Sequence, residues 1–328
     1  GGHAAGVSSM ITKSGTNVWS GSAFEFLRDR ALNAESRSER TAVDSRGQPV
    51  GKQDYRRNQF GGSFGGPLTH DKAHFFVAAE RTKADAFQAV NTGGLFPRFD
   101  GSFPTEYVER LFTGKATRNL NAHQFVSGRY GHNSNVQPYG TSAINPPNNW
   151  ASSDNRFNSF NLNHNWVLSG ARLNELIFQY ADFRNQITSA SSAPNEVFPS
   201  GVTLGANSNT PQTTEQHKFQ FRDDFSWHVY RGGLGHDFKT GVNFINEPHL
   251  FTTFNGGRRI VVYTHATNDL DGPISSVSFS DGDAAANLPM KQLGLYIQDD
   301  WRLNGRLTLN LGLRYDVMTG YQIDQSSD

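Results

Sequence analysis

The chain has 328 residues and no cysteine, and its 30 Lys and Arg residues balance 30 Asp and Glu residues, giving a formal net charge of zero. A disulfide scaffold and a thiolate metal site are therefore excluded, and the electrostatic argument for a nucleic-acid partner is absent. Hydrophobic residues make up only 36% of the chain, yet aromatic residues reach 12%, with 25 Phe and 33 Gly. This composition fits an all-β chain with long polar loops.

No stretch of the chain approaches the roughly 20 consecutive apolar residues that a membrane-spanning helix needs. A membrane-spanning β-strand needs only ~9–11 residues, and half of these are free to be polar, so a barrel in a membrane stays possible. The chain begins Gly-Gly-His without an initiator Met. We expect it to be a mature form, an excised domain or a fragment of a longer protein.

Alternation of apolar and polar residues with period two runs through most of the chain and predicts β-strands. The predicted strands are 19–28, 57–68, 73–83, 104–115, 122–131, 156–168, 171–185, 215–229, 236–247, 290–303 and 306–318. The best helical window, Thr105–Phe112, is short and lies inside one of them.

The connections between the predicted strands are short and long in turn. Short connections are expected at Thr69–Lys72, Ala116–Asn121, Ser169-Gly170, Arg231–Gly235 and Asn304-Gly305. Long connections are expected at 29–56, 84–103, 132–155, 186–214 and 248–289. Outer-membrane barrels have short periplasmic turns and long extracellular loops, whereas a soluble sandwich has no reason to sort its loops in this way. A helix at 105–112 would break this regular order.

Residues Leu293–Val317 give the clearest strand pattern. Their second arm places leucines at 307, 309, 311 and 313 on one face and polar residues or glycine on the other. Asn304-Gly305 joins the two arms, and Asn-Gly is a strong signal for a tight hairpin. A sheet with one apolar and one polar face either covers a soluble core or forms a barrel wall. The order of the loops favours the barrel wall.

In a barrel, this alternation predicts which side chains meet lipid and which meet the lumen. The predicted lipid-facing residues are Phe219, Phe221, Phe225, Phe238, Val242, Phe244, Leu293, Leu295, Ile297, Leu307, Leu309, Leu311 and Leu313. The predicted lumen-facing residues are Lys218, Gln220, Arg222, Asp224, Asn310, Arg314 and Asp316. The expected aromatic girdle at the membrane interfaces consists of Trp19, Trp166, Trp227, Trp301 and Tyr315.

Several motifs resemble TonB-dependent outer-membrane receptors, in particular the Oar-like group. The segment Gly6–Asn17 resembles the last strand of that family's plug domain, and Gly21–Ala34 resembles the first barrel strand and the start of its loop. Arg57–Glu80 resembles the next hairpin. Leu295–Trp301, followed by Leu307–Tyr315, resembles a later hairpin of the same barrel. These motifs stand in the family's order and cover about a third of the chain, whereas 84–290 matches by pattern alone.

The resemblance implies an all-β, partial transmembrane barrel. Residues 1–17 would end the plug and 18–328 would form the N-terminal part of a barrel with 22 strands, about half of them in this chain. The whole protein would sit in the outer membrane of a Gram-negative bacterium. It would contact the TonB complex through an N-terminal region that this chain lacks. The resemblance further implies uptake of a scarce, large substrate such as a siderophore, an oligosaccharide or a peptide-like compound, captured by the long loops given above.

Other chemistry is poorly supported by the sequence. The glycine-rich stretch Phe60–Pro67 lacks the following helix and Lys of a phosphate-binding loop. The histidines show no ligand spacing and are expected on polar surfaces or in the lumen. Asp269, Asp271, Asp281 and Asp283 form an acidic cluster without the spacing of a calcium loop, and the sequence leaves calcium binding open.

An enzyme is not expected either. Asp299 and Asp300 are neighbours on a strand, so their carboxylates point to opposite faces and cannot act on one substrate. No Gly-x-Ser-x-Gly elbow is present, and no cofactor is predicted.

A different class of function stays open at this point. A soluble all-β module, such as a surface adhesin or a carbohydrate-binding sandwich, would show similar strands. It would differ in folding alone in water, whereas a partial barrel leaves two unpaired edges that promote aggregation. The sequence does not identify a transported ligand.

Overall fold

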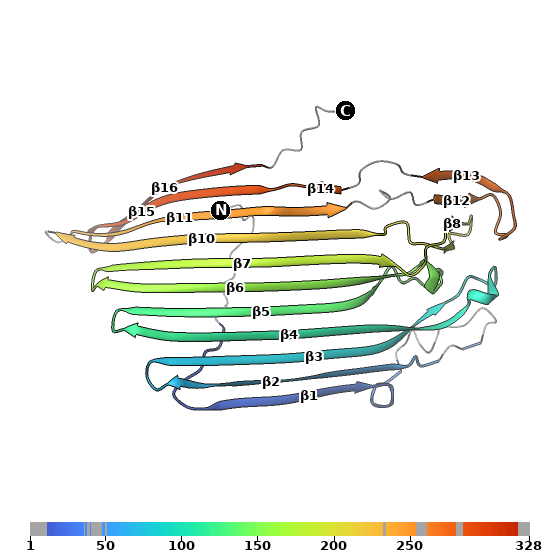
Figure 1. Cartoon of the computed structure of the whole chain (residues 1–328), viewed down its shortest axis with the longest axis horizontal. Coiled ribbons are helices and arrows are strands. Elements are labelled where there is room, and N and C mark those ends of the chain that lie inside the picture. The colour runs from blue at the N-terminus through green and yellow to red at the C-terminus, as the bar shows by residue number, and fades with distance from the viewer. Residues whose placement is uncertain are drawn as a thin grey trace.

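In the computed structural model of the protein, the described residues are 12–35, 37, 40, 48–49, 51–231, 234–253, 261–279 and 285–320. They form a long, curved antiparallel sheet of twelve strands (Figure 1). Its strands are β1 (Ser20–Asp29), β2 (Tyr55–Thr69), β3 (Ala73–Val90), β4 (Gly101–Asn121), β5 (Gln124–Tyr139), β6 (Ala151–Ser169), β7 (Arg172–Ser189), β10 (Gln212–Arg231), β11 (Leu234–Thr253), β14 (Ala285–Asn287), β15 (Met290–Asn304) and β16 (Leu307–Thr319).

The strands follow one another in a simple up-and-down path. Their order is β1-β2-β3-β4-β5-β6-β7-β10-β11-β15-β16, with the short β14 on β11, so β1 and β16 lie at the two edges. All eleven predicted strands are present, and the predicted partial barrel is confirmed. Short turns meet at one end of the sheet and long connections at the other, as Figure 1 shows. These are called the short-turn end and the long-loop end.

Two predicted short connections were wrong in detail. The expected turn Ala116–Asn121 belongs to β4, which continues to Asn121 and then pairs back on β5 from Gln124. Thr105–Phe112, the best helical window, also lies within β4. In the last hairpin the turn is at 305–306 instead of 304–305, because a bulge between Arg302 and Asn304 shifts the register by one residue.

The strands are also longer than predicted at the long-loop end. β3 reaches Val90, β5 reaches Tyr139 and β11 reaches Thr253. There both faces carry polar residues, so the period-two signal fades while the hydrogen-bonded ladder continues. The long connections are correspondingly shorter than expected.

A second, smaller sheet lies at the long-loop end. It contains β8 (Asn195–Val197), β9 (Thr203–Leu204), β12 (Val261–His265) and β13 (Ile274–Phe279) in the order β13-β12-β8-β9. Three 3-10 helices, η1 (Arg30–Leu32), η2 (Pro97–Phe99) and η3 (Pro147–Asn149), also belong to the long connections. Among the described residues, no helix is long and apolar enough to cross a membrane.

Candidate functional site

The register of the large sheet separates two faces of opposite character. Residues directly opposite each other on antiparallel strands have side chains on the same face. One continuous row across the sheet consists of Gly128, Leu162, Phe178, Phe221, Phe244, Leu293 and Val317. The adjacent row on the same side consists of Tyr130, Phe160, Tyr180 and Phe219. We call this side the apolar face and the other the polar face.

Many large side chains of the apolar face are exposed to their surroundings. Phe221 is 41% exposed, Leu295 is 44% exposed and Leu313 is 73% exposed. Continuous exposed apolar surface of this extent marks a contact with lipid or with another protein. The register places all thirteen predicted lipid-facing residues on the apolar face and all seven predicted lumen-facing residues on the polar face.

Two of the carboxylates on the apolar face lie toward its short-turn end, and both are partnered. Asp223 accepts a hydrogen bond of 2.7 Å from the Asn174 amide. Asp299 lies 2.8 Å from the His236 ring nitrogen. Asp299 thus shares a face with Leu311, whereas Asp300 points to the polar face opposite Asn310. The predicted divergence of Asp299 and Asp300 agrees with this register.

Four of the five predicted girdle residues lie toward the short-turn end of the apolar face. The Trp227 ring stacks on Phe238 at 4.9 Å between ring centroids, and the Trp301 ring stacks on His236 at 5.2 Å. Trp19 stacks on Phe64 at 5.3 Å. Tyr315 lies farther from the short-turn end, because its register partner is Leu295, well inside β15.

The polar face carries a charged cluster between β10, β11 and β15. The Tyr296 hydroxyl donates to Asp224 Oδ1 at 2.5 Å, and Arg222 pairs with Asp224 Oδ2 at 2.6 Å. Asp224 is only 3% exposed. Gly241 leaves the space for this cluster, because a Cβ there would lie 2.6 Å from the Tyr296 ring. A glycine is needed here for the close approach of a large neighbour.

Further ion pairs extend this polar character across the sheet. Arg314 pairs with Asp316 at 2.6 Å on β16. Lys218 pairs with the buried Glu247 at 3.4 Å, and Gln216 also donates to Glu247 at 3.2 Å. Six of the seven predicted lumen residues, all except Asn310, therefore take part in polar contacts that the structure describes.

A ladder of asparagines, not singled out from the sequence, lies on the polar face near the long-loop end. The Asn155 amide donates to Asn135 at 3.0 Å, and the Asn185 amide donates to Asn155 at 2.7 Å. Ser153 accepts from Asn185 at 3.0 Å. These positions fall in or beside the stretches 132–155 and 186–214 that the sequence assigned to loops. The alternation Asn133-Ser134-Asn135 was the available signal for a polar strand face.

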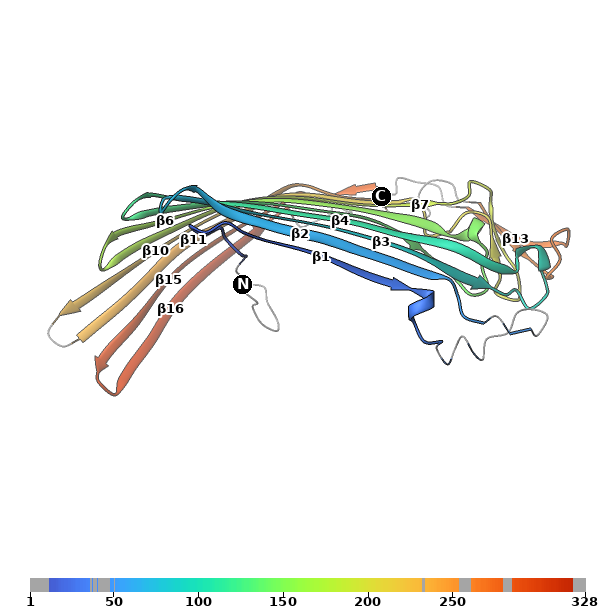
Figure 2. The same ribbon diagram turned by 90° about the horizontal axis from the view of Figure 1, so that it is seen from below.

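Residues 12–17, in the described part of the N-terminal segment, lie on the polar face. Lys115, whose side chain belongs to that face, donates to the Thr12 carbonyl at 3.3 Å. Asn17 accepts a hydrogen bond from the backbone N–H of Asp71 at 2.8 Å. Gly15 packs directly on the sheet, since a Cβ there would lie 2.8 Å from the Gly66 carbonyl oxygen. Figure 2 shows this segment on the concave side of the curved sheet.

At the long-loop end, the second sheet encloses a small apolar core. Its buried residues are Phe96, Phe198, Val202 and Leu204. We call them the loop core. His265 lies against it, 5% exposed, with its ring stacked on Phe198 at 4.3 Å. The expectation that the histidines lie on polar surfaces is therefore wrong for His265, because distant loops fold over it.

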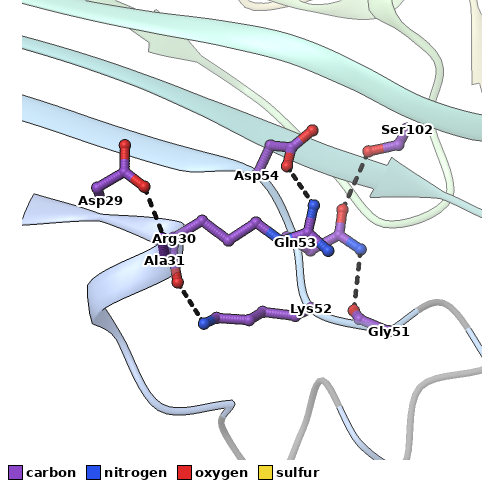
Figure 3. A network of polar contacts seen from close by, with 8 residues as sticks. All are labelled: Asp29, Arg30, Ala31, Gly51, Lys52, Gln53, Asp54 and Ser102. Carbon is purple, nitrogen blue, oxygen red and sulfur yellow. Dashed lines mark hydrogen bonds and ion pairs between the residues drawn. The ribbon is translucent and has the colours of Figure 1, made fainter.

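The first long connection is held at both ends by polar contacts (Figure 3). Arg30 pairs with Asp54 at 2.6 Å, and Lys52 donates to the carbonyls of Arg30 and Asn33. Ser102 of β4 donates to Gln53 at 3.0 Å. This network joins the end of β1 to the start of β2 and to the start of β4.

The predicted acidic cluster is only partly described. Asp269 accepts from the backbone N–H of Asp271 at 3.2 Å in a turn after β12. Asp281 and Asp283 lie outside the described residues. Within the part of the chain that the structure describes, no group of three or more His, Cys, Asp or Glu residues could hold a metal ion.

Residues 11–98 and 86–327 match the family described as the outer membrane beta barrel domain. The chain belongs to this family. It is a partial transmembrane barrel of the Gram-negative outer membrane. In such barrels the short turns are periplasmic and the long loops extracellular, which orients the two ends of the sheet. No curated protein sequence matches the chain.

Three solved structures illustrate the likeness of fold. The outer membrane transporter YddB from Escherichia coli is 14% identical with a TM-score of 0.68, and the siderophore receptor PirA from Acinetobacter baumannii is 15% identical with a TM-score of 0.56. The ferric enterobactin receptor PfeA from Pseudomonas aeruginosa is 12% identical with a TM-score of 0.54. Each match covers 94% of this chain, but this chain spans only 40%, 40% and 41% of those chains, respectively.

Proposed function

We propose that this chain is the N-terminal half of the barrel, with the end of the plug, of an Oar-like TonB-dependent receptor. Residues 1–17 end the plug and 18–328 form barrel wall in this proposal. The observation that carries it is the N-terminal segment on the polar, concave face, bound through Lys115 and Asn17. A plug enters a barrel on its lumen side, and a simple channel has no need of such a segment.

In this proposal the apolar face contacts lipid and the polar face lines the lumen or contacts the plug. Ligand is captured by the extracellular loops that surround the loop core and passes along the asparagine ladder. Neutral amides bind polar compounds by hydrogen bonds without demanding charge. This surface suits a scarce, large polar substrate such as a siderophore, an oligosaccharide or a peptide-like compound, taken up with energy from the TonB complex.

The competing hypothesis of a soluble adhesin or carbohydrate-binding module finds less support. A soluble sheet buries its apolar face against a second layer. Here the buried hydrophobic cluster of the described residues is the loop core, which lies beyond the long sheet and leaves the apolar face open.

Uptake by isogenic bacteria with and without TonB tests the function. The full-length protein is expressed in both strains, which are given radiolabelled ferric enterobactin and labelled maltooligosaccharide as probes. We expect uptake of one probe to saturate at low concentration and to require TonB. Uptake that is linear in concentration and equal in both strains would indicate an open channel and contradict the proposal.

A further inference from the structure

Four arginines form a cross-strand row on the apolar face, on the long-loop side of its aromatic rows. Arg81 of β3 is the direct partner of Arg110 of β4, and Arg156 of β6 is the direct partner of Arg184 of β7. Ser134 of β5 joins the two pairs, because it is the partner of both Arg110 and Arg156. We call these four residues the arginine row. Five strands at a spacing of ~4.8 Å give it a length of ~19 Å.

The positive charges of this row are poorly compensated within the protein. Among the described residues, Arg81, Arg110 and Arg156 form no ion pair, and their side chains are exposed. Like charges directly opposite each other on antiparallel strands destabilise a sheet. Such a pair is tolerated more readily when an external anion lies between the two guanidinium groups.

Three carboxylates near the row are already engaged. Lys83 binds both Glu106 at 2.8 Å and Asp85 at 3.3 Å. Glu215 binds Arg184 at 3.3 Å, so it compensates one end of the row only. Asp182 lies 3.6 Å from His217, and Asp154, two residues from Arg156 on the same face, forms no ion pair with the row in the part of the chain that the structure describes. Among the described residues, the Arg81–Arg110 pair therefore has no carboxylate partner.

The position of the row indicates the chemistry of that partner. Arg184 stands four residues beyond Tyr180 on β7, and Arg156 stands four residues beyond Phe160 on β6. The aromatic rows of the apolar face, which include Phe160 and Tyr180, form an apolar band across the sheet. The arginine row follows the edge of this band on its long-loop side. At the same level, the polar face carries the neutral ladder of Asn135 and Asn155 instead. The positive charge is confined to the side that carries the apolar band.

We propose that the arginine row binds phosphate groups of lipid head groups in the outer leaflet of the membrane. The inference rests on the proposed function in one respect, namely that the apolar face contacts lipid. Guanidinium groups form paired, charge-assisted hydrogen bonds with phosphate oxygens. A phosphate between Arg81 and Arg110 would replace their repulsion with two attractive contacts. A row parallel to the apolar band fits a layer of head groups.

Lipid retention tests this proposal directly. The full-length protein is reconstituted in nanodiscs of phosphatidylcholine with a small fraction of bisphosphorylated lipid A, and lipid A that remains bound after dilution is measured by native mass spectrometry. We expect Arg81→Gln/Arg110→Gln to weaken retention about tenfold or more, the effect of losing charge-assisted bonds. The control Arg118→Gln/Arg129→Gln removes the same charge at the short-turn end and on the polar face, and should retain lipid A normally.

Stability in two environments gives a second readout. In dodecyl maltoside micelles, which carry no phosphate, Arg81→Gln/Arg110→Gln should unfold at equal or higher urea concentration than wild type, because repulsion between the two guanidinium groups is removed. With lipid A present, the same variant should unfold at a lower urea concentration than wild type. The proposal would be overturned if the double variant unfolded at a higher urea concentration than wild type both with and without lipid A. It would also be overturned if wild type retained dephosphorylated lipid A as well as it retains bisphosphorylated lipid A.

The remaining outcomes separate the sources of failure. Displacement of lipid A by millimolar inorganic phosphate would show a site for free phosphate and overturn the lipid assignment. Failure of wild type to insert into either nanodisc would contradict the membrane-facing role of the apolar face, and with it the proposed function. Normal insertion with equal lipid A retention by both double variants would overturn the arginine row alone.

Discussion

Phe178 and Gln179 are neighbours on β7 and point to opposite faces of the sheet. Phe178 lies between Leu162 and Phe221 on the apolar face, and Gln179 lies between Asn161 and Gln220 on the polar face. Because the two residues lie at the same depth, a charge introduced at each of them compares the apolar face with the polar face directly. Leu311 would be less informative, because its register partner is Asp299, which could neutralise an arginine at that position.

We expect Phe178→Arg to reduce the free energy of folding into lipid by ~2–4 kcal/mol, the cost of an arginine at mid-depth on a lipid face. Gln179→Arg should change it by less than ~1 kcal/mol, because the side chain stays in a wet environment. Urea titration of the full-length protein in phosphatidylcholine vesicles measures both. Equal destabilisation by the two substitutions would contradict the assignment of the faces.

The Tyr296 hydroxyl offers a second test at single-residue scale. Its bond to the nearly buried Asp224 stands beside the Arg222 ion pair, and Tyr296→Phe removes it without changing the ring. We expect a loss of ~1–3 kcal/mol of stability, because a buried carboxylate loses a donor. Tyr315→Phe on the apolar face is the matched control and should have little effect. The same urea titration measures the loss of stability in both variants. Equal losses for Tyr296→Phe and Tyr315→Phe would contradict a stabilising role of the Tyr296–Asp224 hydrogen bond.

At the scale of elements, the loop core forms a unit separate from the barrel wall. It consists of loop residues from distant connections, and its strands pair with one another instead of with the large sheet. Its stability therefore depends on packing among a few buried side chains. The ladder of the large sheet does not contribute to it, so the loops can open while the wall stays folded.

Phe198→Ala should destabilise this unit locally by ~3–5 kcal/mol, because Phe198 is only 2% exposed and its loss leaves a cavity. Thermolysin, which cleaves before apolar residues such as Val202 and Leu204, should then cleave the connection between β7 and β10 faster. The strands of the large sheet should keep their protection from hydrogen exchange. Leu95→Ala is the control in a neighbouring loop, since Leu95 is 44% exposed. Loss of protection in β6 and β7 would show that the two units unfold together.

At the scale of the whole molecule, the sheet has two open edges and one open apolar face. β1 and β16 end the strand order. Unpaired edges template further strand pairing, and a large apolar patch favours association. A chain of this kind needs lipid or detergent, together with the strands that would complete its barrel.

The 328-residue chain, refolded alone in water, should therefore aggregate, and it should remain dispersed in dodecyl maltoside. Static light scattering with and without detergent measures this difference. A monodisperse monomer in water would contradict the barrel wall and would favour the soluble adhesin or carbohydrate-binding module. The detergent sample serves as the control for covalent damage during refolding.

The sequence by itself determined the strands and the sorting of their side chains between two faces. Alternation with period two is a local property, because successive side chains on a strand point to opposite sides. The eleven strands and the faces of residues such as Phe221 and Arg222 follow from it. It failed at Ala116–Asn121 and at the bulge near Asn304, where polar residues continue a strand or one extra residue shifts the register.

Only the tertiary structure decided which distant residues meet. The asparagine ladder requires the mutual register of β5, β6 and β7, and the arginine row requires the register of five strands. The burial of His265 on Phe198 joins two connections that lie far apart in the chain. Register between strands is set by pairing and turn geometry across the whole sheet. A local pattern specifies which face a side chain takes, and only pairing along the sheet specifies its neighbours.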